Sequence, residues 1–221
     1  MKSIRLWYKK SGLAIYTSHL DMNRCFTRAV RRAEIPLWYT EGFNPHPYMT
    51  FLMPLPLGQT GMREPIDIRI ENDEMTFSEL KEKMNSVLPQ GLEIVDVTKP
   101  ESKPNEIAAA EYSAELIFAS NAEAEGFAYG ANAVMEQGVL NAEKRSKRGT
   151  KAVNLCEFVR SFKLTQSGSR ISILTVLACG NAVNLNADLL INALLGEFAA
   201  VPERVEIVRN VLLKEDMSFF D

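Results

Sequence analysis

Strand and helix signals follow the same order twice along this chain, on either side of a proline-rich polar segment at 98–106. Apolar residues at every second position predict strands, and apolar residues three or four positions apart predict helices. In each half the order is strand, helix, strand, strand, helix, strand. We therefore predict an α+β protein made of two ferredoxin-like (βαββαβ) sandwiches in tandem. Each has an antiparallel sheet with helices on one face, and the domains span 1–98 and 107–221.

The first half contains two segments whose assignment is less regular. Residues 13–17, which follow a turn signal at 10–12, predict a short second strand or a continuation of the first. Pro36 ends the first helix, so residues 37–40 are expected to leave it as a strand. The remaining expected elements are strands at 4–9, 48–52, 65–71 and 92–97, and helices at 19–34 and 77–88.

In the second half, residues 143–151 carry so many like charges that we expect a hairpin tip or a loop rather than a packed element. The other expected elements are strands at 112–118, 158–165, 170–178 and 204–213, and helices at 122–137 and 187–198.

Composition indicates a soluble globular protein, because 46% of the 221 residues are hydrophobic and 24% are charged. No apolar run is long enough to span a membrane, and the N-terminus lacks a signal-peptide pattern, so we expect a cytoplasmic protein without membrane contact. Cys25, Cys156 and Cys179 are too scattered for a zinc ribbon, an iron–sulfur cluster or a disulfide framework. Glycine-rich phosphate loops are also missing. We therefore predict no metal site, no cofactor and no nucleotide cofactor of its own.

The net charge of −3 hides a strong segregation of charge along the chain. Residues 1–58 carry +5 and residues 143–170 carry +6, so the remainder carries −14. Basic surfaces on an otherwise acidic chain indicate a polyanionic partner. Chance clustering of charges on solvated faces is the alternative.

The helix expected at 19–34 has an apolar face and an arginine face. Ser18 can cap its first turn, with Asp21 as the acidic partner of a capping box. Its arginines fall within an arc of about 100° opposite the apolar positions. Guanidinium groups bind phosphate through two parallel hydrogen bonds, so this face is a candidate phosphate contact, although a solvated helix face explains the pattern too. The arginines are Arg24, Arg28, Arg31 and Arg32.

Both histidines of the chain lie in the proline-rich stretch 18–58. His19 begins the helix, and His46 stands between two prolines in an extended loop. If the loop folds back over the helix, His19, His46 and Asp21 can converge for acid–base work or metal binding. Structural roles, in which each imidazole hydrogen-bonds a backbone carbonyl, are the alternative.

Four motifs carry a resemblance to a known family: SHLD at 18–21, RRA at 31–33, EGFNPHP at 41–47 and PLPLG at 54–58. At these motifs the chain resembles the bacterial radical-SAM-linked protein family, a domain encoded beside, or fused to, a radical SAM protein. The resemblance implies a radical SAM protein as partner. Because a three-cysteine cluster motif is missing here, it also implies that the radical chemistry belongs to that partner. Family members are often encoded near ribonuclease G and ribosomal-protein genes, which is consistent with RNA as the shared substrate.

Three functions remain open from the sequence. We favour an accessory RNA-binding protein that presents ribosomal or transfer RNA to a radical SAM modifying enzyme, and not an enzyme in its own right. The second is an RNA-processing or RNA-modifying enzyme that uses His19 and His46, with Asp21. The third is a docking subunit of a radical SAM complex without RNA contact. The residues expected to bind RNA are Arg24, Arg28, Arg31, Arg32, Tyr39, Phe43, Asn44, Lys144, Arg145, Lys147, Arg148 and Lys151, and Trp38 or Tyr48 can also stack a base.

Overall fold

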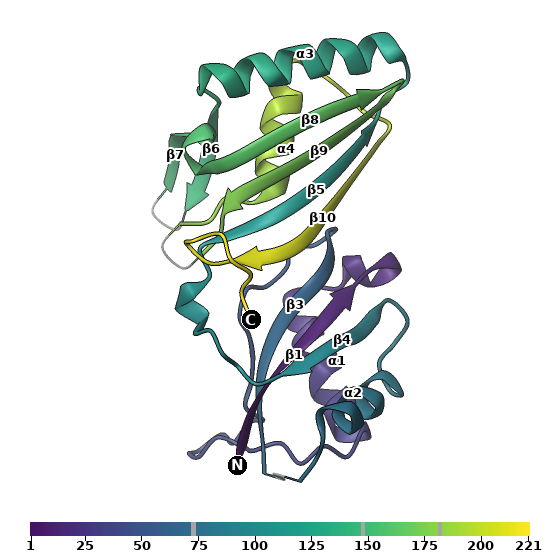
Figure 1. Cartoon of the computed structure of the whole chain (residues 1–221), viewed down its shortest axis with the longest axis vertical. Helices are drawn as coiled ribbons and strands as arrows, with labels where there is room; N and C mark the ends of the chain where they lie inside the picture. The colour runs from purple at the N-terminus through teal and green to yellow at the C-terminus, as the bar shows by residue number, and fades with distance from the viewer. Residues whose placement is uncertain (72–73, 147–148, 181–182) are drawn as a thin grey trace. The chain divides into compact units, whose positions relative to one another are not determined.

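A computed structural model describes residues 1–71, 74–146, 149–180 and 183–221 of the chain. The chain divides into two compact units, the first formed by Met1–Glu106 with Phe219–Asp221 and the second by Ile107–Ser218. Each unit combines a β-sheet with helices (Figure 1), so the α+β class is confirmed. The sequence-based domain ranges differ from this division in two respects, because residues 99–106, expected between the domains, and the last three residues both belong to the first unit.

The first unit holds a four-stranded antiparallel sheet and two helices. Its strands lie in the order β4, β1, β3, β2, and Figure 1 shows β1 between β3 and β4. The elements are β1 (Lys2–Lys10), α1 (His19–Arg32), β2 (Met49–Phe51), β3 (Thr60–Ile70), α2 (Phe77–Asn85) and β4 (Leu92–Thr98).

Successive side chains of β1 point to opposite faces of the sheet, and those on one face pack against the helices. Ile4, Leu6 and Tyr8 belong to the same buried cluster as Phe26 of α1 and Leu80 of α2. Both helices therefore pack on that one face of the sheet. This arrangement agrees with the helical and strand periodicities of the sequence.

The opposite face of β1 carries a buried arginine. The Arg5 guanidinium is fully buried and donates two hydrogen bonds to the Asp67 carboxylate on β3, at 2.7 and 3.0 Å. It donates further bonds to the backbone carbonyls of Asp221 at 2.7 Å and Ser102 at 3.0 Å. The Phe220 ring covers the guanidinium at 4.6 Å. Arg5 thus joins the sheet, the segment after β4 and the last residues of the chain.

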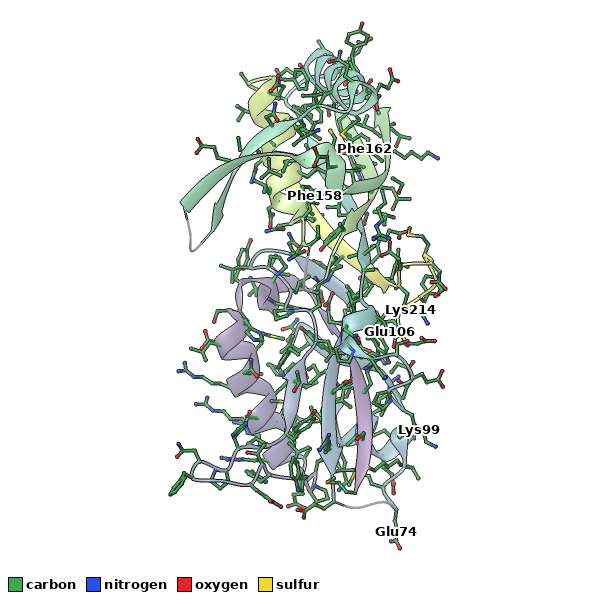
Figure 2. All side chains as sticks on the ribbon, turned by 90° about the vertical axis from the view of Figure 1, so that its left-hand side faces the viewer. Glu74, Lys99, Glu106, Phe158, Phe162 and Lys214 are labelled. Carbon is green, nitrogen blue, oxygen red and sulfur yellow. The ribbon has the colours of Figure 1, made fainter. Side chains whose placement is uncertain are left out.

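The second unit repeats the strand order. Its sheet runs β10, β5, β9, β8, again with every neighbouring pair antiparallel, and Ala110, Tyr112, Ala114 and Leu116 of β5 are buried. A separate hairpin of β6 and β7 projects from the body of this unit (Figure 2). The elements are β5 (Ala109–Ile117), α3 (Asn121–Gln137), β6 (Asn141–Ser146), β7 (Gly149–Asn154), β8 (Val159–Ser167), β9 (Arg170–Ala178), α4 (Ala187–Glu197) and β10 (Arg204–Leu213).

Two expectations for the first half are wrong. Residues 13–17 do not form a strand, because the chain makes a 3-10 helix over Gly12–Tyr16. Only Ala14 of this helix is buried, and a backbone bond of 2.8 Å from Ser11 to the carbonyl of Gly91 fixes its start against another turn. Residues 37–40 make two isolated β-bridges, at Leu37 and Tyr39, in place of a strand.

None of the helices within the described part of the chain has both the length and the apolar character needed to cross a lipid bilayer.

The Arg5 network gives a testable difference between two carboxylates of one sheet. We expect Asp67→Asn to lower the free energy of unfolding by about 3 kcal/mol, because it leaves a buried guanidinium without its counter-charge. Asp96→Asn is the matched control, since Asp96 pairs with Arg63 at a site where both side chains are about two-fifths exposed, and it should cost less than about 1 kcal/mol. Urea unfolding of both variants measures the two values. Equal losses would contradict the role assigned to Arg5.

Candidate nucleic-acid interface

Helix α1 begins at a cap that also fixes an acidic side chain. The Ser18 side chain accepts a hydrogen bond from the Asp21 amide at 3.2 Å and donates one to the Asp21 carboxylate at 2.7 Å. The second bond, helped by Arg24, lowers the pKa of Asp21 below its ordinary value. The Ser18 cap is therefore confirmed, whereas Asp21 bonds the Ser18 hydroxyl and not the Ser18 backbone amide that the predicted capping box requires.

The arginines lie on the solvent side of α1 because the apolar side chains of the helix are buried on its other side. Arg24 pairs with Asp21 at 3.2 Å. Among the residues that the structure describes, Arg28, Arg31 and Arg32 take part in no ion pair. Nitrogen-tipped side chains project from this side of α1 in Figure 2. We call Arg24, Arg28, Arg31 and Arg32 the arginine face.

A groove of about 480 Å³ runs beside the arginine face, between α1 and the residues that follow α2. Arg24, Arg28 and Arg32 line one wall, and Val87 and Pro89 line the other. Three small side chains, Thr17, Cys25 and Ala29, and the carboxylate of Asp21 complete the lining. We call this space the α1 groove.

The turn after α2 is held in place by a close backbone approach. Gly91 has φ +90°, and a Cβ built there would lie 2.4 Å from the carbonyl oxygen of Ser11. Only glycine therefore allows residues 89–91 to sit against the segment that leads into α1. The groove thus has one wall from α1 and one from the residues that follow α2, and the glycine holds the second wall in place.

Cys25 reports on the electrostatics of this groove. Partial burial raises the pKa of the Cys25 thiol above its ordinary value, and the nearby positive charges of Arg28 and Arg32 oppose that shift. The thiolate is therefore stabilised by the same two guanidinium groups that would bind an anion.

The loop at 41–47 is closed by bonds between its two ends. The Thr40 amide donates to the His46 carbonyl at 2.9 Å, and the His46 amide donates to the Thr40 hydroxyl at 3.2 Å. Tyr39 bridges to Pro47. Phe43, inside this closed loop, has a relative exposure of 105%. The loop therefore presents an aromatic ring that packs on none of its neighbours.

His46 is oriented by the same loop. Its Nδ1 lies 3.1 Å from the carbonyl oxygen of Asn44 and 3.1 Å from the Thr40 hydroxyl. Because a carbonyl oxygen only accepts hydrogen bonds, the contact with Asn44 favours the neutral tautomer that has its proton on Nδ1 and leaves Nε2 as an acceptor. His46 itself is exposed.

His19 makes contacts that do not include His46. Its ring meets Phe51 edge-on with the ring centroids 5.3 Å apart, and its Nε2 lies 3.1 Å from the side-chain Nδ2 of Asn23. Over residues 1–71, 74–146, 149–180 and 183–221, no three side chains of His, Cys, Asp or Glu gather closely enough to hold a metal ion. Each of the three predicted catalytic residues thus makes its own contacts: His19 with Phe51 and Asn23, Asp21 with Ser18 and Arg24, and His46 with Thr40 and Asn44.

The remaining aromatics of this stretch divide into exposed and engaged rings. Tyr39 is exposed, whereas Trp38 and Tyr48 face each other with centroids 5.9 Å apart. The guanidinium of Arg69 lies 4.3 Å from the Tyr48 ring centroid and 5.4 Å from that of Trp38. Sequence reasoning missed Arg69, because its position in an alternating strand gave no sign that it stacks on these two rings.

The second basic segment forms part of the β6–β7 hairpin. In its register Lys144 pairs with Lys151 and Arg145 with Thr150. Lys147 and Arg148 lie outside the described residues, so the contacts predicted for this segment stay predictions.

Comparisons with known proteins place the chain in one family. The model of the family described as "Uncharacterized protein conserved in bacteria (DUF2344)" matches residues 3–187. No curated protein matches the chain. Among solved structures, the chain is similar to "Crystal Structure of an Unknown Protein from Galdieria sulphuraria", with 11% identity and a TM-score of 0.27 over 93% of this chain and 95% of that one. At this TM-score the likeness carries no argument about function.

The opposing effects on Cys25 predict a shift in its titration. We expect the double variant Arg28→Gln, Arg32→Gln to raise the Cys25 pKa further, because both stabilising charges are removed while burial stays. The pH dependence of iodoacetamide modification at Cys25 measures this, and the variant should react more slowly at pH 8 than the unchanged protein. Arg31→Gln is the control, because Arg31 neither lines the groove nor affects the Cys25 pKa. An unchanged profile in the double variant would contradict the assigned electrostatics.

Proposed function

This chain belongs to the DUF2344 family of conserved bacterial proteins, and we propose that it is an accessory protein that binds RNA through the arginine face of α1. The observation that carries the proposal is that four exposed arginines share one helix face, and three of them have no carboxylate partner within the described residues. Opposite charges three or four residues apart stabilise a solvated helix face, as Asp21 and Arg24 do here, and the other three arginines lack such a pair among the described residues. Arg28, Arg31 and Arg32 are therefore available to an external anion.

RNA phosphates suit these arginines better than a small anion does. Each guanidinium offers a planar fork of donors and remains charged at any working pH. Several forks in a row along a helix match a ligand with several phosphates, and each neutralised phosphate releases a counterion. The acidic remainder of the chain disfavours nonspecific coverage by nucleic acid elsewhere.

The loop at 41–47 supplies a base contact in this proposal. The Phe43 ring is fully exposed, and Tyr39 is partly exposed at the base of the same loop. Unpaired RNA bases stack on aromatic side chains of this kind, and each stacked base contributes about 1 to 3 kcal/mol to binding. Asn44 and the acceptor Nε2 of His46 would hydrogen-bond the edge of that base.

The basic hairpin is a second phosphate contact in the proposal. Lys144, Arg145 and Lys151 lie on its paired strands, and Lys147 and Arg148 belong to the same segment of sequence. Two basic surfaces suit a ligand that offers phosphates at many positions, as RNA does, more than a small anion.

We also propose that each unit is a ferredoxin-like sandwich. Support comes from the element order βαββαβ, interrupted only by the β6–β7 hairpin, and from the order 4-1-3-2 of the four sheet strands in both units. The partner proposed from the sequence motifs is a radical SAM enzyme that modifies the bound RNA. This chain would present the RNA and leave the radical chemistry to that enzyme.

The RNA proposal is tested by removing the unpaired arginines. We expect Arg28→Ala, Arg31→Ala, Arg32→Ala to weaken binding of bacterial transfer RNA or a ribosomal RNA hairpin by at least about tenfold. The log–log salt slope should become shallower by about 2 units, because three phosphate contacts are lost. Filter binding or fluorescence anisotropy at several salt concentrations measures both quantities.

The control for this experiment also removes three positive charges, at positions outside the arginine face. Arg160, Arg170 and Arg204 are each paired with a carboxylate, and their triple alanine variant should keep most of the affinity and the slope. Phe43→Ala is a further arm, which should weaken binding while leaving the salt slope unchanged. RNA affinity that is equal in all variants would reject the arginine face as the binding surface.

The partner proposal has its own measurement. We expect tagged protein, purified from bacterial lysate treated with ribonuclease, to retain a protein that carries the three cysteine ligands of a radical SAM cluster. Loss of that protein on ribonuclease treatment would mean that RNA alone bridges the two. Its absence with and without ribonuclease would reject the partnership.

A further inference from the structure

We propose that the α1 groove seats a single unpaired RNA strand, with its phosphates on Arg24, Arg28 and Arg32 and its sugars and bases toward Val87 and Pro89. This inference rests on the proposed function, and it adds where the strand lies and which form of RNA is bound. The two walls of the groove differ in chemistry, one cationic and one apolar. A nucleotide strand has the same two sides.

The spacing of the arginines indicates a repeating ligand. Arg24, Arg28 and Arg32 stand at successive four-residue steps of α1, so each is displaced from the last by about 6 Å along the helix axis. A single inorganic phosphate would satisfy one of these forks and leave the others unused. A polymer of phosphates uses all three, and Asp21, whose carboxylate stands beside Arg24, limits the anion-binding length at that end.

The apolar wall of the groove favours a single strand over a duplex. A duplex carries its phosphates on a convex surface and keeps its bases stacked inside, so it meets exposed arginines without entering the α1 groove. An unpaired strand can place sugars and bases against the apolar wall. Cys25 and Ala29 line the groove below the arginines, so a seated strand would cover the Cys25 thiol and a duplex would leave it accessible.

Cys25 therefore gives a direct readout. The protein is used as the full chain with Cys156→Ser, because Cys156 is partly exposed and Cys179 is buried. Iodoacetamide modification of Cys25 is followed by mass spectrometry with a twelve-nucleotide uridine oligomer or a hairpin duplex of RNA. We expect the oligomer at saturation to slow modification by about tenfold and the duplex by less than about twofold.

A charge placed on the apolar wall tests the position of the strand. Pro89 is exposed, and its backbone carbonyl, which accepts a hydrogen bond from the Leu92 amide, is kept in any substitution, so Pro89→Glu should fold normally and put a carboxylate opposite the arginines. We expect this variant to weaken oligomer binding by about tenfold and to abolish Cys25 protection. Pro89→Gln controls for the loss of proline. Gln90→Glu adds the same charge one residue farther along, outside the groove lining, and should bind within about twofold of the unchanged protein.

The outcomes separate this inference from the proposed function. If the oligomer binds with a steep salt dependence while Cys25 modification is unchanged, the groove is not the seat, and the arginine face remains the binding surface. Equal protection by the duplex, or equal effects of Pro89→Glu and Gln90→Glu, would also overturn the inference. If neither RNA binds, the proposed function itself fails and the groove assignment fails with it.

Discussion

The first unit depends on the hydrogen bonds that the buried Arg5 guanidinium donates. It lies at 0% exposure on β1 and satisfies its donors with the Asp67 carboxylate and two backbone carbonyls. A charge buried this way is stabilised only when every partner is in place, so strand register, the segment after β4 and the last residues of the chain are fixed together. The Arg5 face of β1 is covered by the segment after β4 and the last residues of the chain, and α1 and α2 pack on the opposite face. The position of α1 in turn determines where its arginines point.

The candidate interface follows from this packing. The apolar residues of α1 are buried in the core, so the other side of the helix faces solvent. That side carries four arginines, and of these Arg24 is the one that pairs with a carboxylate within the described residues. The α1 groove arises because Gly91 allows the turn after α2 to approach the start of α1. The arginine face and the α1 groove beside it thus come from the packing of α1 and from the identity of a few side chains.

Sequence periodicity predicted much of this fold, because burial of one face imposes a regular pattern on strands and helices. Helix α1, its Ser18 cap and its arginine face followed from spacing alone. Residues 13–17 were mispredicted because a 3-10 helix of five residues has too little pattern to distinguish it from a strand. The role of Arg5 was out of reach, since its partners lie 62, 97 and 216 residues away along the chain. The α1 groove was missed for the same reason, because its apolar wall comes from the residues that follow α2, more than fifty positions away from α1.

The return of residues 219–221 to the first unit has a consequence for biosynthesis. Arg5 leaves the ribosome early, yet one of its carbonyl partners, Asp221, is added 216 residues later. At about 5 to 20 residues per second, this interval is roughly 10 to 40 s. The Arg5 network is therefore complete only after residue 221 has been joined to the chain, and until then water must take the place of that carbonyl at the guanidinium.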